Sequence, residues 1–248
     1  MPERPTILWL SDRVLRITHD VSQDHTIAHA WHIADAIRAA AIDAIDDITL
    51  AYAGVQVRIS EHAAMDAHAA ARVEDLVRSA IDRAGASSLT KINPQIAPRR
   101  SIDIPVCYDA DFALDLESLA RETTLRIDDL VALHTGATYH VHFLGFLPGF
   151  AYMGGVPDPL RVPRHPSPRT RVPAGSVAIA GAQAGIYPST TPGGWRILGR
   201  TPLTVFDPSR NLPSLLQPGD QVRFVRIDRA RFDHLAHNHA PKSREPRP

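Results

Sequence analysis

Cysteine, lysine and long apolar runs are all scarce in this sequence. The one cysteine, Cys107, excludes a disulfide framework and fits a reducing compartment. No apolar run approaches the roughly 20 residues that span a bilayer, and residues 1–11 lack the apolar core of a signal peptide. We therefore expect a cytoplasmic protein without a membrane partner.

The sequence also has no excess of charge of either sign. Lysine plus arginine and aspartate plus glutamate each total 27, which argues against nucleic acid as a partner. The lysines are only Lys91 and Lys242, against 25 arginines. The residues between these two lysines can therefore form neither a Schiff base nor a biotinyl-lysine.

Glycine and proline are concentrated in one part of the chain. Of the 14 glycines and 21 prolines, 11 and 13 lie between Gly145 and Gly219, whereas the earlier part is rich in alanine. This shift predicts two unlike domains, which a chain of 248 residues is long enough to form.

The first part of the chain mixes two apolar periodicities. Alternating apolar residues predict strands, and apolar residues three or four apart predict amphipathic helices. The predicted strands cover residues 6–10, 13–18, 48–53 and 55–60, and the predicted helices cover residues 27–45 and 73–84. This order indicates a small α+β domain over residues 1–86, followed by a polar, aperiodic linker over residues 87–100.

The second part is expected to be mainly β. Predicted strands cover residues 102–108, 139–144, 177–180, 195–199, 203–206 and 221–225, and short helices cover residues 116–122 and 128–134. Short strands separated by glycine and proline turns are typical of a β-barrel or a β-sandwich. We expect this domain over residues 101–228 and a basic, flexible tail over residues 229–248.

Acidic residues are almost absent from a long stretch that is rich in arginine. Between Leu130 and Phe206 the only acidic residue is Asp158. The same stretch holds six arginines: Arg161, Arg164, Arg169, Arg171, Arg196 and Arg200. Arginine binds carboxylates and phosphates bidentately, so this pattern predicts an anion site. Alternatively, the arginines cover the surface of a barrel or pair with acids of the other domain.

The sequence lacks the common hydrolytic motifs. It contains neither a G-x-S-x-G nucleophile elbow nor a G-x-x-x-x-G-K-[ST] phosphate loop. Cys107 lies within an apolar predicted strand, which favours a buried thiol over a nucleophile. We therefore expect the chain to be unequipped for hydrolysis alone.

Two groups of histidines have spacings that could begin a metal site. His25, His29 and His32 fall on one face of a predicted helix, and His140 and His142 share one face of a predicted strand, with His134 nearby. Among 13 histidines such spacings also arise by coincidence, so we expect no metal. His142 is instead a candidate hydrogen-bonding group in the anion site.

Several long motifs occur in a fixed order in the second part. They are GFLPGFAYMGG (Gly145–Gly155), PRHPSPRTRVPAGSVAIAG (Pro163–Gly181), GIYP (Gly185–Pro188), PGGWRILGRTPLTVFDP (Pro192–Pro208) and PGDQVRF (Pro218–Phe224). Through them the chain resembles the family that contains the B subunit of bacterial 5-oxoprolinase, the sporulation kinase inhibitor Kip and allophanate hydrolase subunit 1. The resemblance is strong from Ser101 to Ile227 and weak from Leu8 to Ala84.

This resemblance implies a cyclophilin-like barrel behind an α+β domain. It also implies two partners, which are a barrel protein like the C subunit of 5-oxoprolinase and the separate A subunit of that enzyme. The assembled complex would use ATP to open 5-oxo-L-proline to L-glutamate. Alternatives within the same family are an inhibitor of a histidine kinase and a carboxyltransferase subunit of the allophanate hydrolase or urea carboxylase type.

A small carboxylate substrate would agree with the arginine-rich stretch. Restricted or tight backbone flanks Arg164, Arg171 and Arg200, so we expect these three to make the main anion contacts. The expected supporting residues are His142, Ser176, Gln183, Tyr187 and Trp195. Phe146, Pro148 and Phe150, in a rigid apolar loop, are expected to dock the partner barrel subunit.

Overall fold

The computed structural model describes residues 5–18, 23–51, 54–84 and 100–239. The contacts within the chain divide it into two compact units, Met1–Ala97 and Pro98–Pro248. The expected linker over residues 87–100 lies outside the described residues except for Arg100. The expected domain limits stay a prediction, apart from the tail discussed below.

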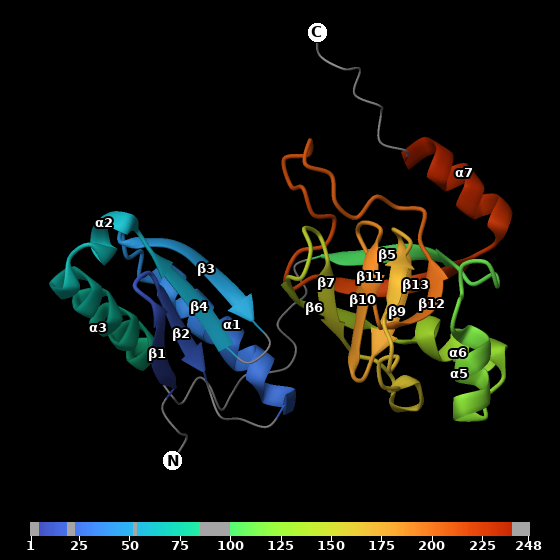
Figure 1. The fold of residues 1–248 in the computed structure, drawn as a ribbon, viewed down its shortest axis with the longest axis horizontal. Helices are drawn as coiled ribbons and strands as arrows, with labels where there is room; N and C mark the ends of the chain where they lie inside the picture. The colour runs from blue at the N-terminus through green and yellow to red at the C-terminus, as the bar shows by residue number, and fades with distance from the viewer. Residues whose placement is uncertain (1–4, 19–22, 52–53, 85–99, 240–248) are drawn as a thin grey trace, which may run out of the picture. The chain divides into compact units, whose positions relative to one another are not determined.

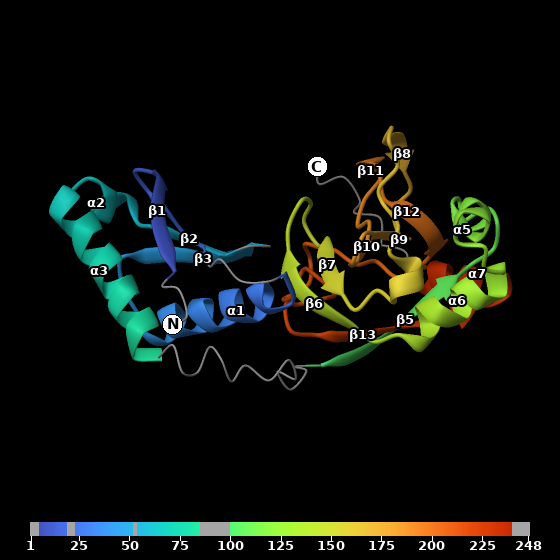
Figure 2. The ribbon, with the colours of Figure 1, turned by 90° about the horizontal axis from the view of Figure 1, so that it is seen from below.

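The first unit is an antiparallel sheet with helices on one face (Figure 2). The strand order is β1 (Thr6–Ser11), β2 (Val14–Thr18), β4 (Gly54–Ile59) and β3 (Ile45–Ala51). The helices are α1 (Gln23–Ala39), α2 (Glu61–Ala64) and α3 (Ala67–Ala84). Alternate residues of β2 and β4 are buried against α1 and α3, because successive side chains of a strand point to opposite faces.

One predicted helix boundary in this unit was wrong. The first helix was expected to reach residue 45 but ends at Ala39, where the backbone turns through Ala41 with a φ of 45°. Ile45 instead begins β3 and packs against the same apolar core. The spacing of apolar residues alone assigned Ile45 to the helix, because a strand that follows a helix after a short turn can continue the apolar repeat of that helix.

The second unit contains a closed barrel of seven strands (Figure 1). Their order is β10 (Gln183–Ile186), β7 (Ala151–Gly154), β6 (Tyr139–Leu144), β13 (Gln221–Ile227), β5 (Ser101–Cys107), β12 (Arg196–Arg200) and β9 (Ser176–Ala180), and β9 pairs with β10. Of these strand pairs, only β5 and β13 are parallel. Because the sheet is closed, the predicted β-barrel is correct and the alternative of a β-sandwich is not. The closed sheet is also compatible with the expected cyclophilin-like barrel.

Further elements surround the barrel. They are the helices α5 (Leu116–Thr123), α6 (Ile127–Gly136) and α7 (Arg229–His239), the short helix η1 (Asp158–Leu160), and a small sheet of β8 (Arg169–Val172) and β11 (Thr191–Gly193). The barrel interior is apolar, with Val177, Ile179 and Phe224 among its buried side chains.

Two expectations for this unit were wrong. Residues 203–206 form no strand beyond an isolated bridge between Phe206 and Ser214, since Pro202 and Pro208 interrupt any longer ladder. Residues 229–239, expected to be part of a flexible tail, form α7. Phe232 is buried there against Phe112, with ring centroids 4.5 Å apart, and this burial stabilises the helix. Residues 240–248 lie outside the described part.

A fully buried histidine of α6 packs against the barrel strand β13. The ring of His134 stacks on Phe224 with centroids 4.4 Å apart, and its Nδ1 lies 2.7 Å from the hydroxyl of Tyr108. Burial lowers the pKa of His134 to about 3, because the charged imidazolium would lose its hydration. His134 is therefore neutral in the folded protein at neutral pH.

We predict that this histidine weakens the fold in mild acid. The unfolded chain takes up the proton near the ordinary pKa of 6.5 and the folded chain only near a pKa of 3, so stability is lost as pH falls through this window. From pH 7 to pH 5 the wild type should lose about 2 kcal/mol more unfolding free energy than His134→Gln. Urea titrations at both pH values measure this, and equal losses would contradict it.

Candidate functional site

A second apolar cluster covers the outer face of the barrel. Along β9, Val177 and Ile179 point into the barrel, whereas Ala178 and Ala180 point outward. The outward cluster consists of Phe150, Val172, Ala178, Ala180, Tyr187, Trp195 and Ile197, with Leu147 and Tyr152 packed against it. Strand β9 therefore buries side chains on both of its faces. The outer cluster forms an apolar layer beneath exposed side chains.

Phe150 occupies the centre of this outer cluster. Its ring is 1% exposed and meets the rings of Tyr152, Tyr187 and Trp195 edge to face, with centroids 4.9, 5.4 and 5.4 Å away. Its Cζ lies over Gly185, where an added Cβ would come within 2.7 Å. The expected partner contact through Phe150 is therefore wrong, because its ring is already buried by contacts within the chain.

Arg164 lies on the exposed side of this cluster. Its guanidinium is stacked over Trp195, 5.6 Å from the ring centroid. Burial raises the pKa of Tyr187 and of Tyr152, and the charge of Arg164 acts against the rise at both phenols. In the described part of the chain no acidic side chain pairs with Arg164. Its charge is free to bind an external anion, which the aromatic rings below would support.

Three of the six arginines are neutralised by acids of the same unit. Arg161 pairs with Asp158 at 3.1 Å and Arg196 with Glu122 of α5 at 3.1 Å. Arg169 donates two hydrogen bonds to the carboxylate of Asp115, at 2.6 and 3.0 Å. All three partner acids belong to the barrel unit, so for these arginines the alternative that they pair with acids of the other domain is wrong.

Asp115 is the residue that sequence reasoning missed. It is 2% exposed and also accepts hydrogen bonds from the ring of His165 at 2.8 Å and the amide of Ile197 at 2.7 Å. Burial alone would raise the pKa of Asp115, but the bonds from Arg169, Ile197 and His165 outweigh it and hold the pKa below its usual value. The available signal was a carboxylate placed between two leucines, Leu114 and Leu116.

Some of the predicted anion-site residues share the outer face of the barrel with Arg164. Trp195 and Tyr187 belong to the cluster beneath it. The register of Ala184 opposite Met153 places Gln183 beside Gly154 on the outer face. A Cβ at Gly154 would collide with the ring of His142, so this ring lies over the same part of the sheet. Burial lowers the pKa of His142 to about 4, with His140 contributing, and leaves the imidazole neutral at pH 7.

The other predicted anion contacts lie elsewhere. Trp195 precedes β12 and Arg200 ends it, five residues further along an extended strand, or roughly 16 Å away. Arg200 donates from Nε to the carbonyl of Ala174 at 2.8 Å, and its guanidinium lies 5.5 Å from the ring centroid of Phe112. Burial lowers the pKa of Arg200, and the charge of Arg229 adds to this.

The remaining two candidates are Arg171 and Ser176. Arg171 is exposed on β8. Ser176 is 2% exposed and lies opposite Arg200 in the register of β9 and β12. A site that joins Arg164, Arg171 and Arg200 stays a prediction, and Arg164 is the candidate that the aromatic face supports.

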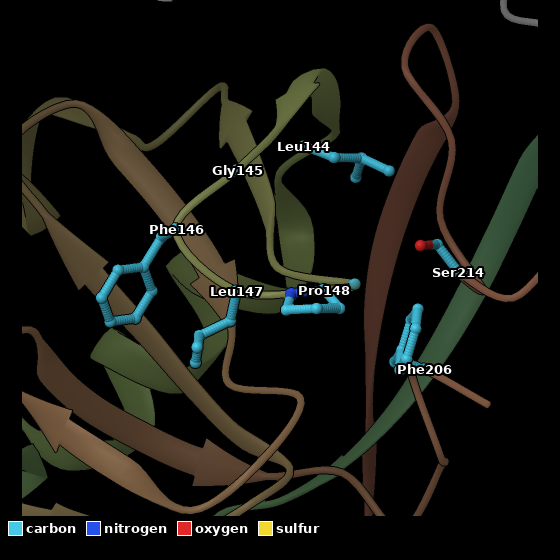
Figure 3. A pocket seen from close by; sticks show the side chains of 8 residues that line it. Leu144, Gly145, Phe146, Leu147, Pro148, Phe206 and Ser214 are labelled. Carbon is cyan, nitrogen blue, oxygen red and sulfur yellow. The ribbon is translucent and has the colours of Figure 1, made fainter. Parts of the chain in front are cut away.

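The loop between β6 and β7 lines a pocket of about 400 Å³ (Figure 3). Its lining residues are Leu144, Gly145, Phe146, Leu147, Pro148, Gly149, Phe206 and Ser214. The loop packs closely on Phe206 through Gly149, which has a φ of 85° and no room for a side chain. Phe146 is 60% exposed with a φ of 68°, and Figure 3 shows its ring directed away from Phe206 and Ser214.

The described residues offer no ready-made metal site. No group of three or more histidine, cysteine, aspartate or glutamate side chains among them is arranged to hold a metal ion. Of the first histidine set, the side chains of His25 and His29 lie outside the described part. Within the same residues, no helix has both the length and the apolar character needed to cross a membrane.

The sequence matches a family described as carboxyltransferase domain, subdomain C and D, over residues 5–216. The chain belongs to this family. The match includes the β6–β7 loop, Arg164 and Trp195, so the outer face described above lies within the carboxyltransferase domain.

Curated relatives share about half of the chain at high identity. The B subunit of 5-oxoprolinase from Bacillus subtilis is 50% identical over 129 residues, which are 52% of this chain and 54% of the relative. The protein of the same name from Escherichia coli O157:H7 is 51% identical over 126 residues, 51% of this chain and 58% of the relative. The chain thus aligns with little more than half the length of these relatives.

Solved structures extend the likeness to nearly the whole chain. A conserved uncharacterized protein from Pyrococcus horikoshii is 34% identical, with 92% of this chain and 100% of that chain covered and a TM-score of 0.52. The urea amidolyase of K. lactis has a TM-score of 0.72 at 16% identity, with 95% of this chain and 15% of that chain covered. The second likeness shows a shared fold.

We predict that the carboxyltransferase barrel is sensitive to substitution beneath Phe150. Gly185→Ala would place a methyl group 2.7 Å from Cζ of Phe150 and 3.2 Å from the carbonyl oxygen of Ala151, so the ring must move. We expect a loss of about 1–3 kcal/mol in unfolding free energy. Gly136→Ala, in α6 with no heavy atom within 4 Å, is the matched control and should cost nothing. Urea unfolding measures both, and equal effects would contradict the packing described.

Proposed function

We propose that this chain is one component of an ATP-dependent 5-oxoprolinase, which opens 5-oxo-L-proline to L-glutamate. The curated relatives are named as the B subunit of 5-oxoprolinase, which supports the assignment. The observation that carries it is the guanidinium of Arg164, which is stacked on Trp195 and pairs with no acid in the described part of the chain. An arginine held in this way suits the carboxylate of a small substrate.

In this proposal the outer face binds and orients the substrate. Arg164 holds the carboxylate, and Trp195 and Tyr152 support the apolar carbons of the five-membered ring. A neutral His142 and Gln183 are placed on the same face to hydrogen-bond the ring amide. The cluster around Phe150 makes the base rigid, which lowers the entropy lost on binding.

The proposed enzyme is active only as an assembly. Its other components are a second barrel protein, like the C subunit of 5-oxoprolinase, and the A subunit of that enzyme. In this proposal the assembled complex consumes ATP, and this chain contributes no phosphate loop to bind it.

Phe146 supports a docking role for the β6–β7 loop. A phenylalanine that is 60% exposed at a positive φ is costly in an isolated chain. Burial of the ring against the second barrel protein would offset that cost.

The first test reconstitutes the complex with a variant at Arg164. We expect Arg164→Ala to raise KM for 5-oxo-L-proline about tenfold to a hundredfold, the contribution of a charge-assisted hydrogen bond, with little recovery in Arg164→Lys. Arg161→Ala, which removes an exposed arginine already paired with Asp158, should keep the wild-type KM. The wild-type chain alone should not turn over the substrate. Wild-type kinetics for Arg164→Ala would contradict the proposal that Arg164 binds the substrate carboxylate.

The second test measures assembly. We expect Phe146→Ala to weaken binding to the second barrel protein, with a loss of about 2 kcal/mol, as truncation of an aromatic anchor commonly does. Leu212→Ala removes another apolar side chain that is 60% exposed and serves as the control. Calorimetric titration gives both affinities. If the two substitutions have the same effect, Phe146 is not an anchor.

A further inference from the structure

The carboxylate of Asp115 joins segments that are distant in sequence. It precedes α5 and accepts from Arg169 at the start of β8, from His165 in the preceding loop and from the amide of Ile197 in β12. Its position before the helix is that of an N-cap, but the side chain makes no cap hydrogen bond and turns toward the barrel instead. Asp115 thus does not cap the helix with its side chain, and its carboxylate makes tertiary contacts instead.

The segments held by Asp115 are those that carry Arg164 and Trp195. His165 follows Arg164, and its backbone amide donates to the carbonyl of Gly194 at 2.7 Å, one residue before Trp195. On the other side, Arg196 donates from Nε to the carbonyl of Pro163 at 3.2 Å. Both neighbours of Arg164 are therefore bonded to the neighbours of Trp195.

Asp115 adds side-chain bonds to both sides of this pair. It binds the ring of His165 next to Arg164, and the amide of Ile197 two residues beyond Trp195. Only a carboxylate can accept from all these donors at once, because an asparagine would present its own N–H groups to Arg169 or His165. Arg164 itself is exposed, so its placement over Trp195 depends on its neighbours being held.

We propose that Asp115 is a positioning residue that keeps the guanidinium of Arg164 stacked over Trp195. It touches no substrate and acts through His165 and Ile197. The inference rests on the proposed function only for the identity of the ligand. The stacked pair that Asp115 maintains is a property of the chain before any ligand binds.

The test reads the environment of Trp195 in the full, ligand-free chain. The indole N–H resonance of Trp195 is identified among those of Trp9, Trp31 and Trp195 by its loss in Trp195→Phe. Arg164→Ala should move this resonance by removing the stacked charge. Asp115→Asn should move it in the same direction.

A second buried aspartate provides a matched control. Asp220 is 0% exposed and binds Arg100 and the amide of Gln217, at strand β13 rather than at the outer cluster. Asp220→Asn should lower the unfolding midpoint as Asp115→Asn does, yet leave the resonance of Trp195 unmoved. If Asp115→Asn is destabilised but keeps the wild-type resonance, its role is structural only and the proposal is overturned.

Kinetics of the assembled complex separate this inference from the proposed function. Asp115→Asn should raise KM for 5-oxo-L-proline roughly tenfold, similar to the rise in KM expected for Arg164→Ala. The value of kcat should be nearly unchanged, because the substitution impairs orientation of the carboxylate and not the chemical step. A raised KM with an unchanged kcat supports the positioning role, and an unchanged KM contradicts it. A wild-type complex without any turnover would overturn the proposed function, whereas the Trp195 resonance would still decide the role of Asp115.

Discussion

The barrel strands β7, β9 and β12 pack side chains on both faces, because the barrel interior fills one face and the cluster around Phe150 covers the other. Inside, residues such as Val177 and Ile179 fill the barrel, and outside, Ala178 and Ala180 lie under Phe150 and its aromatic neighbours. Small residues on the outward side, including Gly185 beneath Phe150, let large rings lie close to the sheet. The aromatic cluster that results supports Arg164 through Trp195, because an exposed arginine needs a rigid surface to hold one orientation.

Electrostatics then distinguish Arg164 from its neighbours in sequence. Arg169 pairs with Asp115 and Arg196 pairs with Glu122. These ion pairs connect β8 to the residue before α5 and β12 to α5 itself. Arg164 lies between these acids and arginines in the sequence, without an acid of its own in the described part of the chain. Arg169 and Arg196, which form ion pairs within the chain, thus follow the candidate binding arginine in the sequence.

Much of the secondary structure could be predicted from residue spacing. The strand over residues 139–144 agrees with β6, and alternation over residues 177–180 located most of β9. The short strands β7, β8, β10 and β11 were missed, since three or four residues are too few to show a period. Phe150 was assigned to the surface because a glycine-proline loop precedes it. Its burial depends on Gly185, Tyr187 and Trp195, which approach only when the barrel closes.

The sequence by itself determined the family of the chain, the kinds of elements in its two parts and an arginine-rich stretch with a single acid. These are properties of composition, local spacing and motif order, which need no knowledge of distant contacts. Only the tertiary structure decided which arginines are neutralised. Asp115 lies 54 residues before Arg169, and Glu122 lies 74 residues before Arg196. Pairings over such separations follow from how strands and helices pack around a closed sheet, and no local pattern in the chain encodes them.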